Sequence, residues 1–235
     1  MAGVDEEQAT RQHGASAFFD AVQDLLVADD GTFRLLGSQL EIAEHLRDLP
    51  ARTHTRVWSM AERSTLGSLR RGHEETMRSV ERGVDCRSLM SPFAVRVRLV
   101  TSFLRAESSP CRIILVPGSM LLADDVLLVA GRRGSPISTT IWRTEDPEVV
   151  RQAAAAFEDV WSAARPIEEV ALLPALEERE LMVALGMIDG DTDREIADRL
   201  GIAPRTVQVL VRRIIDWCGA RNRTHAVALL AGSDA

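Results

Sequence analysis

The segment Asp191–Val227 predicts two helices separated by a sharp turn. Thr192 and Glu195 have the spacing of a capping box, which marks the start of the first helix, and Gly201 is a typical stop signal. Pro204 is favourable in the first turn of a second helix, where its missing amide hydrogen would have no partner anyway. In that helix, apolar residues recur at i, i+3, i+4 and i+7, which predicts a buried face made of Val207, Leu210, Val211 and Ile214.

The opposite face of the second helix is polar and basic. Its side chains can contact phosphates and base edges if the helix lies in a major groove of DNA. We expect this contact face to consist of Arg205, Thr206, Gln208, Val209, Arg212 and Arg213. Thr192 and Arg194 of the preceding helix are expected to support phosphate contacts. The alternative is an arginine-rich helix that is only solvated, but the cap, turn and periodicity together favour DNA binding.

Local charge agrees with this interpretation. Residues 202–225 contain five arginines and a single acid, Asp216, whereas residues 177–201 contain eight acids and three arginines. The whole chain has a net charge of −7, so any affinity for nucleic acid has to come from the local basic patch.

This segment resembles the LuxR-type (GerE-like) helix-turn-helix domain. The resemblance is carried by an L-x-x-R-E opening at Leu176, by REIADRLGIAPRTV at 194–207 and by ARNRTHAV at 220–227. It implies a four-helix domain over 175–235, with the recognition helix within Ile202–Trp217 and a last helix at Asn222–Leu230 that often forms a dimer contact in relatives. It also implies control of transcription. One departure is Ala203, which replaces the usual serine cap at a cost of about 1 kcal/mol.

Composition excludes several kinds of chemistry in the rest of the chain. All 28 basic side chains are arginine, so there is no lysine for a Schiff base or for a kinase or Walker phosphate site. Cys86, Cys111 and Cys218 have no C-x-x-C spacing and are expected to be reduced and mostly buried. The five histidines lack the spacing of metal ligands, so we expect neither a metal nor a cofactor. Because no signal peptide or membrane span is recognisable, a cytoplasmic location is expected.

Helix and strand patterns alternate over residues 15–165, which predicts an α/β domain with a mixed sheet covered by helices. Residues 1–14 are expected to be flexible, and 166–174, with two prolines, to form a linker. The predicted helices are Ala17–Val27, Gln39–Leu49, Ser64–Arg82, Phe93–Leu104 and Glu148–Ala163. The predicted strands are Arg56–Met60, Val84–Met90, Cys111–Val116, Val126–Ala130 and Ile137–Trp142.

This upstream part resembles the degenerate phospholipase D-like sensor domain of some actinobacterial LuxR-type regulators and of TrmB-like regulators. The resemblance is diffuse and rests on the segments Leu35–Pro50, Glu81–Leu89, Ala123–Asp125 and Ala153–Pro166. Phospholipase D chemistry needs H-x-K-x-x-x-x-D, but counting back from Asp124 puts Pro117 at the histidine position and Ser119 at the lysine position. We therefore expect no enzyme activity and interpret Asp124 as a turn residue between strands.

A ligand- or partner-sensing role remains for the upstream domain. Aromatic and guanidinium groups near strand ends suit small polar or anionic ligands. The candidates are Trp58, His73, Arg87, Trp142 and Arg143, although each taken alone has an ordinary structural explanation.

The sequence thus predicts a homodimeric regulator that reads an inverted repeat in double-stranded DNA. A small-molecule effector and RNA polymerase are further candidate partners, and no membrane partner is expected. Two alternatives stay open: a constitutive DNA-binding dimer without a ligand, and a phospholipase D-like phosphodiesterase with a DNA-targeting tail.

Overall fold

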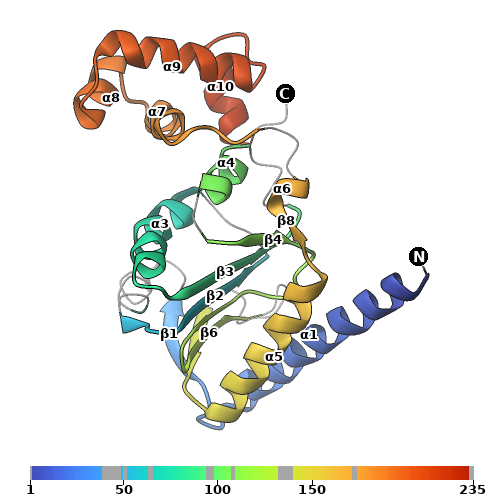
Figure 1. Ribbon diagram of the computed structural model, residues 1–235. Helices are drawn as coiled ribbons and strands as arrows, with labels where there is room; N and C mark the ends of the chain where they lie inside the picture. The colour runs from blue at the N-terminus through green and yellow to red at the C-terminus, as the bar shows by residue number, and fades with distance from the viewer. Residues whose placement is uncertain are drawn as a thin grey trace. The chain divides into compact units, whose positions relative to one another are not determined.

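The computed structural model describes residues 2–38, 49, 52–62, 66–93, 98–106, 109–131, 140–170 and 174–232 (Figure 1). The chain forms two compact units. The sheet unit comprises Met1–Pro92 and Glu107–Val170, and the helical unit comprises Phe93–Ala106 and Ala171–Ala235.

The sheet unit is built on an eight-stranded mixed sheet within the described residues, with the order β1-β7-β6-β5-β2-β3-β4-β8. β2, β3 and β4 run parallel to one another, and the other pairings are antiparallel. The strands are β1 Arg34–Ser38, β2 Arg56–Ala61, β3 Asp85–Met90, β4 Cys111–Ile113, β5 Met120–Ala123, β6 Val126–Ala130, β7 Thr140–Thr144 and β8 Arg165–Pro166. The predicted α/β class with a mixed sheet is confirmed.

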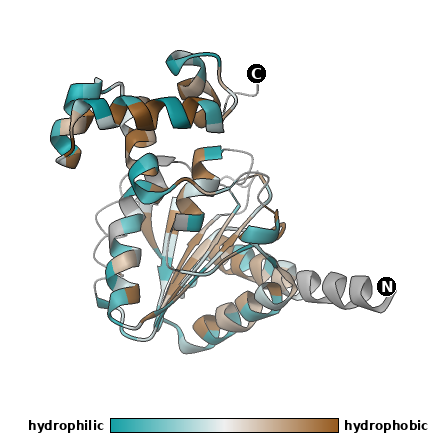
Figure 2. Ribbon diagram, turned by 45° about the horizontal axis from the view of Figure 1, so that its top comes forward, coloured by the Kyte–Doolittle hydropathy of each residue, from teal (hydrophilic) through white to brown (hydrophobic). Residues whose placement is uncertain are grey.

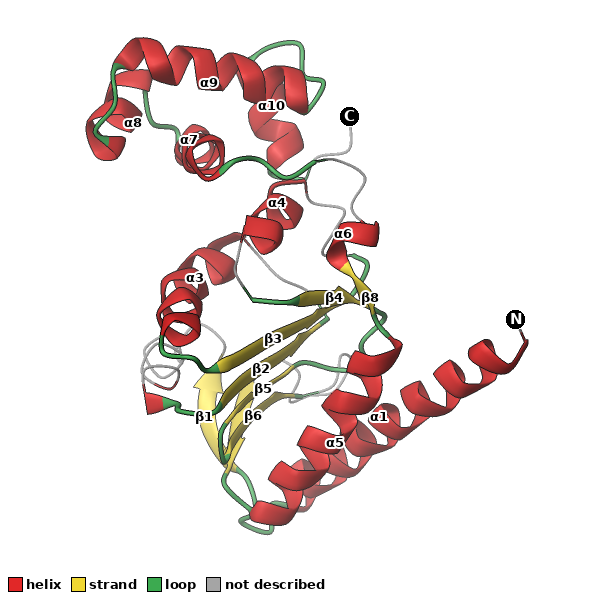
Figure 3. Ribbon diagram, viewed as in Figure 1, coloured by secondary structure: helices red, strands yellow, loops and turns green. Residues whose placement is uncertain are grey.

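Helices cover both faces of this sheet (Figures 1 and 3). α1 (Ala2–Ala28) and α5 (Pro147–Ala163) lie side by side on one face, and α3 (Leu66–Glu81) lies on the other. The short helix α6 (Ile167–Val170) follows β8. The main core lies beneath α1 and α5, where Phe19 of α1 and Phe157 of α5 are buried with Met60 and Leu122 of the sheet.

Local signals explain why α5 forms where it does. Asp146 is its N-cap, and the carboxylate accepts the amides of Glu148 and Val149, both at 3.0 Å. Pro147 occupies the first turn, where it costs no hydrogen bond. Apolar residues at helical spacing then face the sheet, and Figure 2 shows brown and teal alternating along the helix.

The helical unit contains five helices in its described part (Figure 3). They are α4 Arg98–Ala106, α7 Glu178–Asp189, α8 Asp193–Leu200, α9 Pro204–Trp217 and α10 Arg223–Leu230. α4 lies between β3 and β4 in the sequence, yet it packs against α7 and α10. Four helices of this unit match those expected near the C-terminus, so the all-α character of that region is also confirmed.

Some segments differ from the expectation. The helix α1 begins at Ala2. Residues 2–14, which were expected to be flexible, therefore form the first turns of the same unbroken helix that packs on α5. Part of the expected linker 166–174 is ordered, because β8 pairs with β4 and α6 follows directly. No strand was predicted at β1, and β5 was expected only as the strand that precedes the Asp124 turn, without bounds of its own. The helix predicted at Gln39–Leu49 lies, apart from Leu49, outside the described residues.

All three cysteines are buried and form no disulfide, as expected. Burial raises the pKa of the Cys218 thiol, which disfavours the reactive thiolate. Among the described helices, none is both long and apolar enough to span a bilayer. In the same part of the chain, no three His, Cys, Asp or Glu side chains are grouped as metal ligands.

Candidate nucleic-acid interface

The turn between α8 and α9 is fixed by local hydrogen bonds. The Thr192 amide donates to Glu195 Oε2 at 2.7 Å, and the Glu195 amide donates to Thr192 Oγ1 at 3.3 Å, which is the predicted capping box. The Thr192 hydroxyl also donates to Glu195 Oε2 at 2.7 Å, and the bonds from the Thr192 amide and hydroxyl lower the pKa of Glu195. Gly201 ends α8 in the left-handed conformation with φ 63°, and Ala203 begins α9 without a side-chain cap, as expected.

α9 separates a buried face from an exposed one. Val207 and Ile214 are fully buried and Leu210 and Val211 nearly so, whereas all six residues predicted to contact DNA are exposed. Three of these six, Arg205, Val209 and Arg212, follow the i, i+4, i+7 spacing and form one stripe opposite the buried face. Val209 is 50% exposed in the middle of this stripe. The α9 stripe therefore presents an apolar contact between two guanidinium groups.

The arginines of α9 differ in their surroundings. The Arg213 guanidinium lies 3.8 Å from the Glu180 carboxylate of α7, which is only 14% exposed. Arg205 and Arg212 have no ion-pair partner among the described residues. Arg213 is therefore partly committed to the protein, while Arg205 and Arg212 are available to a ligand of opposite charge.

Two other arginines of the helical unit support its structure. Arg199 Nη1 lies 2.6 Å from Asp191 Oδ2. Arg223, at the start of α10, pairs with Asp193 and donates to the Asp191 carbonyl oxygen at 2.7 Å, which joins α10 to the start of α8. Thr192 and Arg194 are both exposed beside this joint.

Asp216 was not among the predicted site residues. It is exposed and continues the α9 stripe by one more turn, four residues after Arg212. A carboxylate there repels phosphate, so the basic surface of α9 ends at this position. The i+4 spacing was the signal in the sequence that could have identified it.

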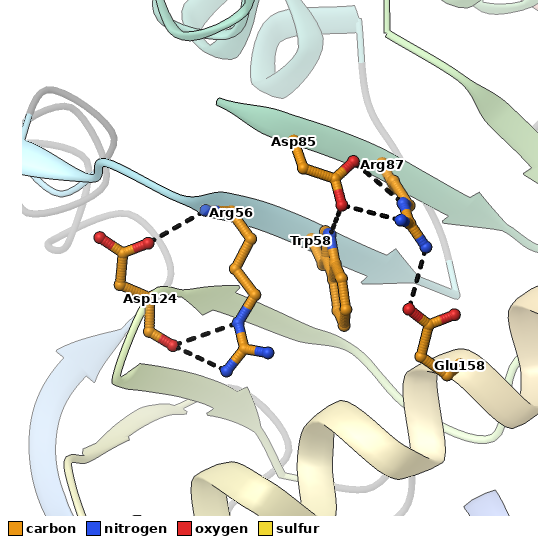
Figure 4. A network of polar contacts seen from close by, with 6 residues as sticks. All are labelled: Arg56, Trp58, Asp85, Arg87, Asp124 and Glu158. Atoms are coloured by element: carbon orange, nitrogen blue, oxygen red, sulfur yellow. Dashed lines mark hydrogen bonds and ion pairs between the residues drawn. The ribbon is translucent and has the colours of Figure 1, made fainter. Parts of the chain in front are cut away.

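The predicted ligand-binding residues of the sheet unit are only partly brought together. Trp58 and Arg87 are neighbours on β2 and β3, with the Arg87 guanidinium carbon 4.9 Å from the Trp58 ring centroid. Asp85 Oδ2 accepts the Trp58 indole N–H at 3.0 Å, and Arg87 bridges Asp85 and Glu158, as Figure 4 shows. The polar groups of this pair are thus already satisfied by the protein.

The other three candidates lie elsewhere in the sheet unit. Trp142 and Arg143 are adjacent on β7, so their side chains point to opposite faces of the sheet. Trp142 packs against the main core, and Arg143 pairs with Glu145 at 2.5 Å. His73 is half-buried on α3.

Asp124 lies in the two-residue turn between β5 and β6, with φ 49°. Burial raises the pKa of its carboxyl, but hydrogen bonds from the Thr55 hydroxyl and from the amides of His54, Arg56 and Thr55 outweigh that effect and lower the pKa to about 2. Arg56 also donates to the Asp124 carbonyl oxygen at 3.1 Å (Figure 4). Both carboxylate oxygens therefore have structural partners, in agreement with a turn role.

The two other positions of the phospholipase D motif, Pro117 and Ser119, lie in the loop before β5. The Ser119 hydroxyl accepts the Glu62 amide at 3.2 Å. Beside the Asp124 turn is a hollow of about 350 Å³ lined by Arg56, Asp124, Asp125, Glu145, Pro147, Val150, Arg151 and Ala154. None of the five predicted ligand-binding residues lines it.

Comparison with known proteins agrees with the geometry of the helical unit. Residues 174–230 match the family described as bacterial regulatory proteins, luxR family. The chain is 32% identical over 142 residues to the probable transcriptional regulatory protein SgaR of Hyphomicrobium methylovorum. The match covers 55% of this chain and 62% of SgaR, so the chain spans less than two thirds of that relative.

Two solved structures of low sequence identity align with part of the chain. TrmBL2, an archaeal chromatin protein, is 13% identical with a TM-score of 0.47, over 57% of this chain and 53% of that one. Nuc of Salmonella typhimurium, a phospholipase D family member, is 12% identical with a TM-score of 0.45, over 57% of this chain and 96% of that one. These values are too low to indicate a shared function. The family match and the α7–α10 geometry agree, and residues 174–230 form a helix-turn-helix domain of the LuxR family.

Proposed function

We propose that the protein is a sequence-specific DNA-binding regulator of transcription whose helix α9 reads the major groove. The observation that carries this proposal is the α9 stripe, in which Arg205 and Arg212 flank exposed Val209 and have no ion-pair partner among the described residues. Arginine can bind a guanine edge with two hydrogen bonds, and an apolar side chain suits the methyl group of thymine. The match to SgaR, named as a probable transcriptional regulator, supports the same role.

The other predicted DNA contacts are assigned from the positions of the residues on α8 and α9. Thr206 and Arg213 lie on one flank of the stripe and Gln208 on the other. Arg213, held near Glu180, suits a phosphate beside the groove, as does exposed Arg194 of α8. Thr192 uses its side chain for the capping box, so its proposed part is to present the amino end of α8 to a phosphate.

A homodimer on an inverted repeat is the assembly that we propose for DNA binding. Two recognition helices about one helical turn apart, roughly 34 Å, would enter successive major grooves. An effector or partner of the sheet unit would change DNA affinity by favouring one arrangement of the two helices. RNA polymerase is a candidate partner at the promoter.

The test is a selection of genomic DNA fragments by the purified protein, followed by sequencing of what is retained. The same selection is made with the double variant Arg205→Ala, Arg212→Ala and with a control, Arg151→Ala, whose side chain on α5 is 67% exposed. We expect a shared inverted repeat with the protein and the control, and none with the double variant. A motif that persists in the double variant would rule out the assignment of α9 as the reading helix.

Adding cell extract to the selection separates the regulated protein from the constitutive alternative. Affinity that changes with extract indicates an effector or partner, while full affinity without extract and no change upon its addition supports a constitutive dimer.

A further inference from the structure

The helical unit contains a hollow of its own, at the carboxyl end of α9. Its volume is about 390 Å³, which lies within the range of small-molecule sites. It is lined by Arg98, Asp216, Trp217, Cys218, Gly219, His225 and Leu229. We call it the α9 end site.

His225 gives this site an unused hydrogen-bonding group. Its Nδ1 accepts the Arg221 amide at 3.1 Å, so in the neutral ring the hydrogen must be on Nε2. Nε2 is buried and has no hydrogen-bond partner among the described residues. A buried donor without an acceptor costs free energy. Because Nε2 is closed to solvent in this structure, the imidazole ring has to turn towards the hollow before a ligand oxygen can accept its hydrogen and remove that cost.

Arg98 brings a positive charge to the same site. Its guanidinium donates to the carbonyl oxygen of Cys218, the C-cap of α9, where the end of the helix dipole favours a cation. This is the one hydrogen bond of Arg98 with a described residue, so other N–H groups of the guanidinium remain available. A guanidinium and an imidazole N–H together suit an anionic group with two oxygens.

The rest of the lining limits what can bind. Trp217 and the buried Leu229 offer apolar surface for the body of a ligand. The exposed Asp216 carboxylate at the same site disfavours a phosphate or a dicarboxylate, because it repels a second negative charge.

We propose that the α9 end site binds a small monocarboxylate with an apolar body, whose oxygens contact His225 Nε2 and the Arg98 guanidinium. The ligand competes with the Cys218 carbonyl for Arg98 and so acts on the end of the recognition helix. Arg98 belongs to α4, which lies between the strands β3 and β4 in the sequence. The site therefore connects the end of α9 to a helix whose two neighbours along the chain are strands of the sheet. The effect on DNA rests on the function proposed above, but the binding itself does not.

Binding is tested with the full chain and three probes, benzoate, phenylacetate and hexanoate, each compared with its uncharged amide. Titration calorimetry measures affinity, and the NMR signals of the His225 ring report where the probe binds. We expect at least one carboxylate to bind with a Kd of about 1 mM or tighter and its amide to bind about tenfold more weakly. The His225 signals should shift with the same saturation curve.

Two variants and a control locate the site. Arg98→Gln and His225→Phe should each weaken carboxylate binding about tenfold, whereas Arg151→Gln on α5 should leave it unchanged. Circular dichroism melts identify a variant that fails to fold. If a variant does not fold, the shift of the His225 NMR signals in the unaltered protein is the measurement that decides whether the probe binds at this site. No carboxylate binding at about 1 mM, or binding that does not shift His225, overturns the proposal.

DNA affinity with and without the bound carboxylate tests the regulatory consequence. A changed affinity for the selected repeat supports it, and an unchanged affinity overturns control through α9 while leaving the binding result standing. A protein that binds the carboxylate but selects no DNA sequence contradicts the proposed function and not the α9 end site.

Discussion

Individual arginines of α9 are expected to contribute differently to DNA binding. Arg212→Ala removes from the α9 stripe a guanidinium that has no ion-pair partner in the described part of the chain. It should weaken binding to the selected site by about 1–3 kcal/mol, with relaxed specificity. Arg213→Ala removes a side chain that Glu180 already holds at 3.8 Å, so the loss should be smaller and similar for all sequences. Competition between specific and random DNA measures both effects. Equal losses of specificity in the two variants would contradict the distinction.

Asp216 should limit the basic surface of the same helix. Asp216→Asn removes a repulsive charge four residues after Arg212 and should raise the affinity for random DNA several-fold at low salt. Because the effect is electrostatic, the gain should shrink as the salt concentration rises. Filter binding over a salt series checks this, with Asp198→Asn on α8 as the control. A gain that is independent of salt would argue against charge as the cause.

Asp124 should contribute to stability in a pH-dependent way. Its pKa is lowered from 3.8 to about 2, so its stabilising effect is present above about pH 4 and is lost as the pH falls towards 2. Asp124→Asn tolerates the φ of 49° but loses acceptor strength, and should cost about 1–2 kcal/mol at pH 7 and about half as much at pH 3, which lies between the two pKa values. Urea unfolding at both pH values measures this, with the neighbouring Asp125→Asn as control. A pH-independent loss would mean that backbone conformation, not the carboxylate, is responsible.

The packing of the helices in the helix-turn-helix domain depends on one close approach. A Cβ on Gly186 of α7 would lie 2.8 Å from Ile196 Cγ1 of α8 and 2.5 Å from the Arg199 guanidinium. Arg199 can move away, but Ile196 is fully buried and cannot move without displacing its neighbours. Gly186→Ala should therefore destabilise the domain by about 1–3 kcal/mol despite the better helix propensity of alanine. Chemical unfolding tests this, with exposed Gly72→Ala on α3 as the matched helical glycine.

α4 shows that sequence order and packing partners can differ. Leu99 and Leu104 are buried on this nine-residue helix, which packs against α7 and α10. Leu104→Ala should cost about 2–5 kcal/mol and speed amide hydrogen exchange in α7 and α10, although it lies about 75 residues before α7 and about 120 residues before α10. The control Leu122→Ala in β5 should speed exchange in the sheet unit instead. Unchanged exchange in α7 and α10 would show that α4 does not support them.

At the scale of the whole molecule, the proposed dimer is tested by counting the chains bound to one DNA site. If a pair of chains reads an inverted repeat, analytical ultracentrifugation should give two chains per DNA site and one per half-site duplex. Inserting five base pairs between the half-sites should abolish cooperative binding, because it rotates one half-site by about half a turn. Binding of one chain to the full repeat would contradict the dimer.

Local rules in the sequence determined the helix-turn-helix domain and the strongest elements of the sheet unit. The capping box at Thr192, the stop at Gly201 and the i, i+3, i+4 apolar pattern of α9 depend on neighbours within a few residues, so they were predictable. The same is true of α5 and of β6, whose apolar run is bounded by a turn. The exposed face of α9 followed directly from its buried face.

Tertiary structure alone decided features that depend on residues far apart in the sequence. The order of the strands, the pairing of β8 with β4 and the packing of α4 with α7 and α10 reflect long-range burial that no local pattern encodes. The Glu180 contact that distinguishes Arg213 from Arg212, and the meeting of Arg98 with the end of α9, arise in the same way. Sequence spacing fixes which side of a helix a residue occupies, whereas its partner across space is fixed only when whole elements pack and exclude water.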